Sequence, residues 1–372
     1  MKSRKRISTA TTAVLLSMIL TDLAPAQAVD PGSAVYTMSN RTEGNSILLF
    51  NRNPRTGRLT QEPLSFPTGG NGTGGSLGNQ NAVVIDESDR WLYAVNAGSG
   101  SISAFRIELE RLAPIQTIGS GGARPISVTI HDHLLYVLNE NADQPDSITG
   151  FTLDTDGKLS PLPDSTRQLS GVGSDPAQIQ FDPDGNVLVV TEKATNIIDT
   201  FTVDENGLPS ARIEHPSTRP TPFGFAFGKR NQVFISEANG ATPDVSYVVS
   251  YTVGKDGSLA VIEVENTTET AACWVVVSHD GRFAFASNTD SASISGFKIK
   301  FDGQLDLLKP DGVSGQTGNP IDIAFSQDNR YLYSLDSRDE TITAFRVSPR
   351  GRLTKIQTVT GLPDGANGLA VR

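Results

Sequence analysis

The stretch RWLYAVN at residues 90–96, followed by SISAFRI at residues 101–107, decides the fold. Near the other end of the chain the same pattern returns as RYLYSLD at residues 330–336 and TITAFRV at residues 341–347. Each piece alternates apolar and polar residues and is rich in β-branched and aromatic types. This pattern is typical of short strands joined by tight turns, and it lacks the period of a helix.

An aromatic residue of the second piece recurs along the whole chain. It stands at Phe50, Phe105, Phe151, Phe201, Tyr251, Phe297 and Phe345. Asp-Gly or Asn-Gly pairs follow most of these positions, and such pairs supply the positive φ angles of tight hairpins. Seven units of about 49 residues, with four short strands each, predict an all-β, seven-bladed β-propeller with four antiparallel strands per blade.

The two ends of the repeat indicate how the ring closes. The first unit begins with AVYTMSN at residues 34–40, which matches a second strand and has no first strand before it. The last residues, NGLAVR at 367–372, match a first strand. We therefore expect the C-terminal strand to complete the first blade, which leaves no open sheet edge. Residues 29–372 are then one propeller domain.

Residues 1–28 have the pattern of a secretory signal peptide. Four basic residues within the first six precede a short apolar stretch, and AQA at residues 26–28 provides a small-residue cleavage site. The apolar stretch is too short to span a bilayer comfortably. We predict cleavage after Ala28 and a secreted or periplasmic protein without membrane attachment; an uncleaved anchor is the alternative.

The charge of the chain narrows its partners. The formal net charge is −10, and charged residues form only 19% of the sequence. An acidic protein repels phosphate backbones, so neither nucleic acid nor an anionic membrane surface is an expected partner. A small molecule or a glycan is the expected ligand. The oligomeric state is left open, with a monomer as the default expectation.

Three features that often carry chemistry are interpreted as structural. Cys273, the one cysteine of the chain, stands in an apolar run and is interpreted as a buried, inert thiol. The four histidines lack the spacing of a zinc site, so neither a metal nor another cofactor is expected. GNGTGG at residues 70–75 matches a dinucleotide-binding pattern outside the strand–helix context that such a site needs. A flexible loop is the better interpretation.

A carboxylate or carboxamide stands at the end of every second strand. Asn and Asp at such positions bond nearby backbone amides and shape the following turn. Glutamate fits that role less well because of its extra methylene, so Glu192 and Glu237 are candidate functional residues. The full set is Asn40, Asn96, Asn139, Glu192, Glu237, Asn288 and Asp336.

A second ring comes from the opening of each first strand, which lines the central channel of a propeller. Most of its members are small. Gln178, Trp274 and Asp322 are not, and we predict that they give one channel mouth polar groups and an aromatic floor. Packing between blades is the alternative interpretation of Trp274. The full ring is Ala82, Ser127, Gln178, Gly224, Trp274, Asp322 and Gly368.

The repeat length, the Asp-Gly hairpins and the closing strand resemble those of the lactonase-like seven-bladed propellers. That family includes a 6-phosphogluconolactonase and a fungal carboxymuconate-lactonizing enzyme. TEKATN at residues 191–196, TPFGFAF at 221–227 and TAACW at 270–274 are similar to segments of a secreted branch. The resemblance implies a catalytic set of two arginines, a histidine and a glutamate. Of these only the glutamate is retained, as Glu192; the other positions fall at Ala177, Ile126 and Thr289.

Two functions stay open at this point. The first is an exported lactonase-like enzyme with an altered site, which hydrolyses or isomerises a small lactone or sugar-acid-type substrate. Glu192 is then the general acid or base and Lys193 an electrostatic partner, while the pocket is shaped by Gln178, Glu237, Trp274 and Asp322. The second is a non-catalytic exported scaffold. The missing arginines favour it, because nothing obvious replaces them in stabilising the oxyanion of lactone opening.

Overall fold

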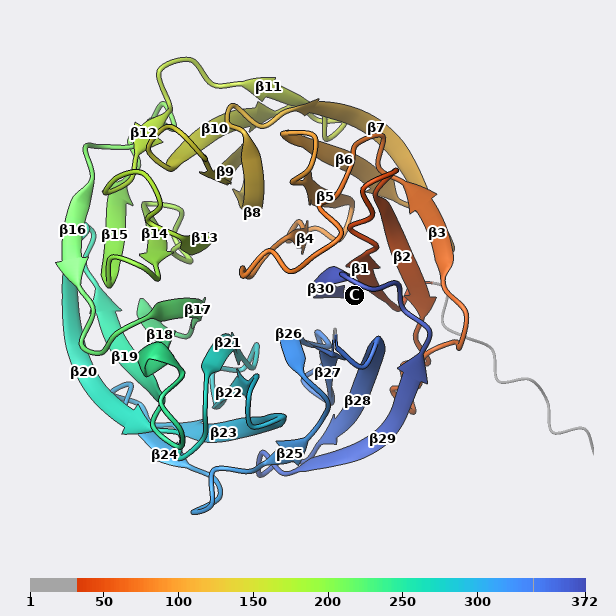
Figure 1. Cartoon of the computed structure of the whole chain (residues 1–372), viewed down its shortest axis with the longest axis vertical. Coiled ribbons are helices and arrows are strands. Elements are labelled where there is room, and N and C mark those ends of the chain that lie inside the picture. The colour runs from red at the N-terminus through yellow and green to blue at the C-terminus, as the bar shows by residue number, and fades with distance from the viewer. Residues whose placement is uncertain (1–31, 337) are drawn as a thin grey trace, which may run out of the picture.

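The computed structural model describes residues 32–336 and 338–372, so the predicted signal peptide lies outside the described residues. These residues form seven small antiparallel sheets arranged in a ring (Figure 1). The predicted seven-bladed β-propeller is confirmed. The helical content of the described residues is a single 3₁₀ turn, Asn239–Ala241. No helix within these two ranges has the length and hydropathy needed to cross a membrane.

In each blade the first strand lies nearest the centre of the ring and the last lies on the rim (Figure 1). Blade 1 contains β30 (Asn367–Val371), β1 (Ala34–Met38), β2 (Ser46–Asn51) and β3 (Leu64–Pro67). Blade 2 contains β4 (Val83–Ile85), β5 (Trp91–Asn96), β6 (Ser101–Ile107) and β7 (Leu112–Gly119). Blade 3 contains β8 (Arg124–His131), β9 (Leu134–Glu140), β10 (Ser147–Leu153), β11 (Leu159–Pro161) and β12 (Arg167–Gln168). Blades 4 and 5 contain β13 (Pro176–Phe181), β14 (Val187–Glu192), β15 (Ile197–Thr202) and β16 (Ile213–Pro216), and β17 (Pro222–Phe227), β18 (Gln232–Glu237), β19 (Tyr247–Val253) and β20 (Leu259–Asn266). Blades 6 and 7 contain β21 (Ala272–Val277), β22 (Phe283–Asn288), β23 (Ser293–Ile299), β24 (Leu305–Leu307) and β25 (Gly315–Gln316), and β26 (Pro320–Phe325), β27 (Tyr331–Asp336), β28 (Thr341–Val347) and β29 (Leu353–Thr360).

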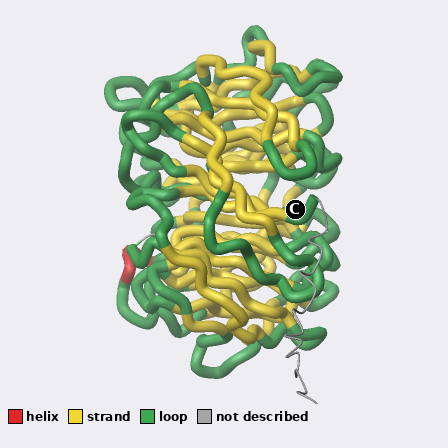
Figure 2. Tube along the Cα trace, turned by 90° about the vertical axis from the view of Figure 1, so that its right-hand side faces the viewer, coloured by secondary structure: helices red, strands yellow, loops and turns green. Residues whose placement is uncertain are grey.

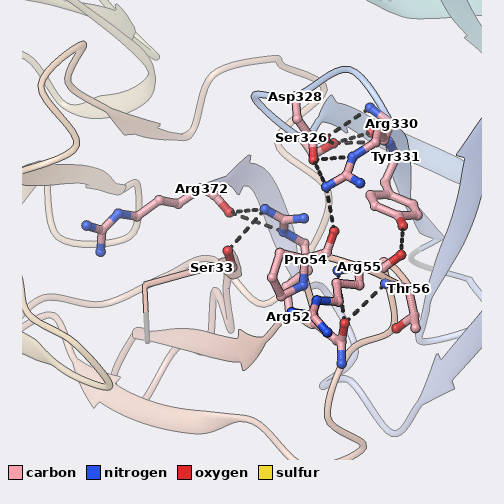
Figure 3. Close-up of polar contacts among 12 residues, drawn as sticks. Ser33, Arg52, Pro54, Arg55, Thr56, Ser326, Asp328, Arg330, Tyr331 and Arg372 are labelled. Atoms are coloured by element: carbon pink, nitrogen blue, oxygen red, sulfur yellow. Dashed lines mark hydrogen bonds and ion pairs between the residues drawn. The ribbon is translucent and has the colours of Figure 1, made fainter. Parts of the chain in front are cut away.

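The C-terminal strand closes the ring, as predicted. Strand β30 pairs antiparallel with β1, so that Val371 lies opposite Val35. Arg52 strengthens the closure, because its guanidinium Nε and Nη2 donate to the main-chain oxygen of Arg372 at 3.2 and 3.0 Å (Figure 3). Its Nη2 also donates to the Ser33 hydroxyl at 3.3 Å. Blade 1 is thus built from both ends of the described chain.

Neighbouring blades are joined by a repeated contact. A tyrosine of the second strand donates its hydroxyl to a glycine carbonyl in the outer hairpin of the next blade. The pairs are Tyr93–Gly157 at 3.1 Å, Tyr136–Gly207 at 2.6 Å and Tyr333–Gly57 at 2.8 Å. The φ angles of these glycines are 77°, 79° and 72°. The predicted turns at Gly157 and Gly207, and the turn at Gly57, therefore both reverse the chain and accept hydrogen bonds between blades.

The core lies between the blades, which pack face to face. The seven repeated aromatic residues all fall on third strands and are at most 3% exposed. Because the strands are antiparallel, the connections alternate between the two faces of the ring, as the edge-on view in Figure 2 shows. We call the face with the hairpins between first and second strands the hairpin face. The face with the connections between blades is the loop face.

Candidate functional site

Residues 77–81, LGNQN, cross the central channel at the loop face, and we call them the channel plug. The Asn79 side-chain Nδ2 donates to the carbonyl of Ile126 in blade 3. The Gln80 N–H donates to the carbonyl of Ala177 in blade 4 at 3.1 Å. In Figure 1 the connection before β4 reaches from the inner edge of blade 2 toward the middle of the ring. The plug thus bonds the inner strands of the next two blades in the ring after blade 2.

The plug also binds blade 6. The Gln80 side-chain amide donates to the carbonyl of Val275 at 2.8 Å and accepts from its N–H at 3.2 Å, as a neighbouring strand would. The Trp274 indole Nε1 donates to the carbonyl of Asn79 at 2.6 Å. A Cβ atom on Gly224 would lie 2.1 Å from the Gln80 Oε1, so the glycine leaves the space that the plug occupies.

Lys193 ties the plug to blade 4. Its side chain is 9% exposed. Its ammonium contacts Gly78 O at 2.7 Å, Pro176 O at 3.0 Å and the Asp175 carboxylate at 3.0 Å. Burial lowers the pKa of Lys193, and the nearby Asp175 charge opposes this shift. Because three acceptors match the three N–H groups of the ammonium, Lys193 is a fully bonded clip on the plug.

The glycine-rich connection before the plug, residues 70–75, is a loop, as the sequence predicts, and its backbone is bonded to blade 1. Gly72 N donates to Arg41 O at 2.7 Å, and Gly74 N donates to Asn40 O at 2.7 Å. The Asn40 side-chain Oδ1 accepts from Thr73 N at 3.0 Å. A Cβ on Gly72 would lie 2.1 Å from the Asn40 carbonyl carbon, so this glycine permits close backbone approach.

Glu192 ends β14 and is fully buried. Its carboxylate accepts from Ser170 N at 2.9 Å, from the Ser170 hydroxyl, and from Thr195 Oγ1 at 2.5 Å. Asp199 of β15 lies beside it, and burial together with the Glu192 charge raises the pKa of Asp199 to about 8. Arg212 bonds the Asp199 Oδ1 at 3.0 Å. Two neighbouring carboxyl groups therefore hold a proton near neutral pH inside blade 4.

Glu237 occupies the matching position in blade 5 and is also fully buried, which raises its pKa. It accepts from Thr218 Oγ1 at 2.7 Å, Arg219 N at 2.5 Å and Tyr251 OH at 2.6 Å. Like Glu192, it holds the connection that enters its own blade. The longer glutamate side chain reaches that connection, and Glu192 also bonds the following turn at Thr195. The functional roles of both glutamates stay predictions.

Gln178 and Asp322 lie beside the inner strands of neighbouring blades. The Gln178 amide donates to Phe225 O at 2.9 Å and accepts from Phe225 N at 2.6 Å, which repeats the contact of Gln80 with Val275. Asp322 Oδ1 accepts from Ile323 N at 2.9 Å. Asp322 is 3% exposed, and burial raises its pKa well above the usual range. Burial thus favours the uncharged form of this carboxyl group.

The six predicted site residues separate into groups. Lys193 and Trp274 both contact the plug. The ring of Phe223 lies between them: the Lys193 ammonium lies over this ring, and the ring centroids of Phe223 and Trp274 are 4.8 Å apart. Glu192 and Glu237 bond the connections that enter their own blades. Cys273 is buried, as predicted, and burial raises the pKa of its thiol to about 12, which disfavours the nucleophilic thiolate.

The channel is open on the hairpin face. Two cavities of about 310 and 260 Å³ share Asn81, Gln180 and Leu369, and together they fill the channel beyond the plug. A vestibule of about 630 Å³ at the hairpin face also borders Gln180. Among the described residues, no group of three His, Cys, Asp or Glu side chains is placed to hold a metal ion.

The sequence reasoning missed the residues that line this open half. Each stands two positions after a member of the predicted first-strand ring, on the same face of its strand. The sequence signal that identifies them is the alternation of side chains along each inner strand. They are Val84, Thr129, Gln180, Ala226, Val276, Ala324 and Ala370.

Comparison with known proteins agrees with this architecture. Residues 44–172 match the family model described as lactonase, 7-bladed beta-propeller. The resemblance to the lactonase-like seven-bladed propellers is confirmed. The chain is similar to the 6-phosphogluconolactonase of Erwinia tasmaniensis, with 25% identity over 72% of this chain and 79% of that protein. The 6-phosphogluconolactonase of Bacillus subtilis is 22% identical over 77% of this chain and 86% of its own length.

A solved structure gives the same fold. The periplasmic gluconolactonase of Pseudomonas aeruginosa superposes on this lactonase-like propeller with a TM-score of 0.71 and 17% sequence identity. The superposition covers 90% of this chain and 98% of the other.

Proposed function

We propose that this lactonase-like propeller is an exported protein that binds a small lactone or a related sugar-derived ligand and does not open it at the loop-face mouth. The contacts of the channel plug carry the proposal. Asn79 and Gln80 bond directly to Ile126 and Ala177, which are the positions where the resemblance places a catalytic histidine and a catalytic arginine. The plug therefore covers the mouth at which the family's chemistry is expected.

The charges at this mouth support the same proposal. Opening a lactone requires stabilisation of a developing oxyanion. The position of the second family arginine is Thr289, whose hydroxyl donates to Pro320 O at 3.0 Å. Lys193 supplies a cation there, but its three donors are engaged by the plug and by blade 4. Glu192 has no direct path to a ligand while its oxygens bond Ser170 and Thr195.

The proposal is tested with the mature protein and a panel of lactones, sugar acids and oligosaccharides. Thermal unfolding measures binding, because a ligand of the native state raises Tm. Hydrolysis is followed in parallel for the wild type and Glu192→Gln. We expect at least one ligand to raise Tm, with no turnover that depends on Glu192. Metal-independent lactone hydrolysis at ordinary enzymatic rates, lost in Glu192→Gln, would remove the proposal.

The carboxyl pair in blade 4 favours a second candidate, a lactonase with an altered site. Neighbouring carboxyl groups of which one holds a proton suit acid–base chemistry, with Glu192 as base and Asp199 as proton donor. This candidate requires the plug to leave the mouth. Glu237→Gln is its matched control, because Glu237 has the same position and similar contacts in blade 5. Only Glu192→Gln should then abolish turnover.

A further inference from the structure

The open half of the channel is a continuous space with a closed floor. Its floor contains Gln80 and Asn81 of the plug and the carboxyl group of Asp322. Gln80 is fixed by its two bonds to Val275, so the floor is built on the fold rather than on a free loop. The vestibule and the channel share Gln180, which gives one route from the hairpin face to the floor.

Most of the side chains that line this half are apolar. Val84, Ala226, Val276 and Ala324 are half-buried and line the two cavities. Gln180, also half-buried, and Thr129 are the polar side chains of this layer, and the Gln180 Oε1 accepts from Gln178 Nε2 at 3.2 Å. An apolar enclosure with a few placed polar groups is typical of a small-molecule site.

The charge of the lining restricts the ligand. Among the described residues that border these two cavities there is no Lys or Arg; the titratable groups are Asp322 on the floor and His279 at the edge. Lys229 and Arg230 line the vestibule outside. Burial raises the pKa of the Asp322 carboxyl and so favours its uncharged form, which can donate a hydrogen bond. A carboxylate or phosphate at the floor would be desolvated with no cation beside it.

We propose that the open half of the channel is a binding site for an uncharged ligand with an apolar body and one hydrogen-bonding head, the chemistry of an alkyl-substituted lactone. The head lies at the floor, where Asp322 and Gln180 can donate to a carbonyl oxygen. The body lies against Val84, Val276 and Ala324. This inference rests on the proposed binding function and names the ligand class and the end of the channel that receives it.

Trp274 provides a direct readout. It contacts the plug, and the chain has one other tryptophan, Trp91 of β5. A Trp91→Phe protein therefore reports on the channel floor through Trp274 emission alone. The probes are δ-decanolactone, which is uncharged and carries an alkyl chain, and gluconate, which is an anion. Binding is measured by the change in emission and by the shift of Tm.

The blocking variant is Ala324→Phe, which fills the channel wall; Ala324→Leu replaces it if the larger side chain lowers the yield of folded protein. Ala260→Phe on the exposed outer strand β20 is the matched control. We expect δ-decanolactone to bind, gluconate not to bind, and Ala324→Phe to weaken binding by at least about tenfold. The control should bind as the parent does.

Three results would overturn the assignment: no response to δ-decanolactone at millimolar concentration, tighter binding of gluconate, or unchanged binding in Ala324→Phe. The failure of the proposed function looks different. It appears as lactone turnover that Glu192→Gln abolishes, whatever the effect of the Ala324 variants, because Glu192 lies at the loop face inside blade 4.

Discussion

The two ends of the central channel differ in how their polar groups are used. At the loop face, the donors and acceptors of the channel plug bond the inner strands of blades 3, 4 and 6, with Lys193 as a buried clip. At the hairpin face, the channel is a cavity lined mainly by apolar side chains, above the buried carboxyl group of Asp322. The central channel is thus closed by the plug at the loop face and open to a ligand at the hairpin face.

This difference shows how a propeller can close one end of its central channel while it keeps the same fold. Inner-strand side chains such as Gln178 satisfy the backbone of the next blade, and Gln80 of the plug makes the same contact from outside the blade. The channel plug makes the same kind of contact with an inner strand and thereby closes this end of the channel. The buried backbone groups of that strand gain the hydrogen-bond partners that they require. The other mouth then becomes the route to the channel.

The largest expected effect comes from Gly224→Ala. The new Cβ would lie 2.1 Å from Gln80 Oε1 and 2.7 Å from the Cys273 carbonyl oxygen, so plug and blade 6 cannot both keep their places. We expect a loss of about 3 kcal/mol in the free energy of unfolding, measured in urea. Gly75→Ala is the control, because no atom lies within 4 Å of its Cβ. Equal stability of the two variants would contradict a packed plug.

Lys193→Met should have the next largest effect. It removes the ammonium and leaves the carbonyls of Gly78 and Pro176 without their charged donor. We expect a loss of about 2 kcal/mol in the free energy of unfolding and faster hydrogen exchange in the plug. Lys255→Met, on an exposed hairpin, should change neither quantity. An unchanged exchange rate in Lys193→Met would show that Lys193 does not hold the plug.

The carboxyl pair of blade 4 should make stability depend on pH. The pKa of Asp199 is raised to about 8 in the folded protein, so the native state binds a proton that the unfolded state has released. Stability therefore falls as pH rises through 8, by about 1 kcal/mol between pH 7 and pH 8. Asp199→Asn should flatten this part of the stability profile. A variant profile with the wild-type slope would place the titrating group elsewhere.

The smallest effect concerns Cys273, which is buried beside the plug at Trp274. Burial raises its pKa to about 12, so a thiol reagent should modify it only when the structure opens. We expect the rate of modification to be about tenfold higher in Lys193→Met than in the wild type, because the variant opens more often. Rapid modification of the wild type would mean that the loop-face mouth is open.

Much of the fold could be predicted from the sequence because propeller blades repeat. The alternation in residues 90–107 and 330–347 identified the strands, and the termini indicated the closing strand that β30 provides. The channel plug could not be predicted in the same way. Its role depends on contacts between Gln80 and Val275, which are far apart in sequence and follow no local pattern.

The candidate site was harder to predict for a related reason. Glu192 and Glu237 were distinguished because glutamate suits a short turn poorly, and the structure shows that the longer side chain reaches the connection entering the blade. Gln178 and Asp322 were expected at a channel mouth, and they bond inner-strand backbone. A polar residue facing a channel has the same sequence pattern whether it holds a ligand or a neighbouring strand.

The central claim is that the chain seals the loop-face mouth with its own plug. Native-state hydrogen exchange of the Gln80 amide tests it most directly, because that N–H donates to Ala177 across the channel. We predict exchange slower by orders of magnitude than that of the exposed Glu205 amide in an outer hairpin, close to the rate set by global unfolding. Exchange of Gln80 as fast as that of Glu205 would contradict the account.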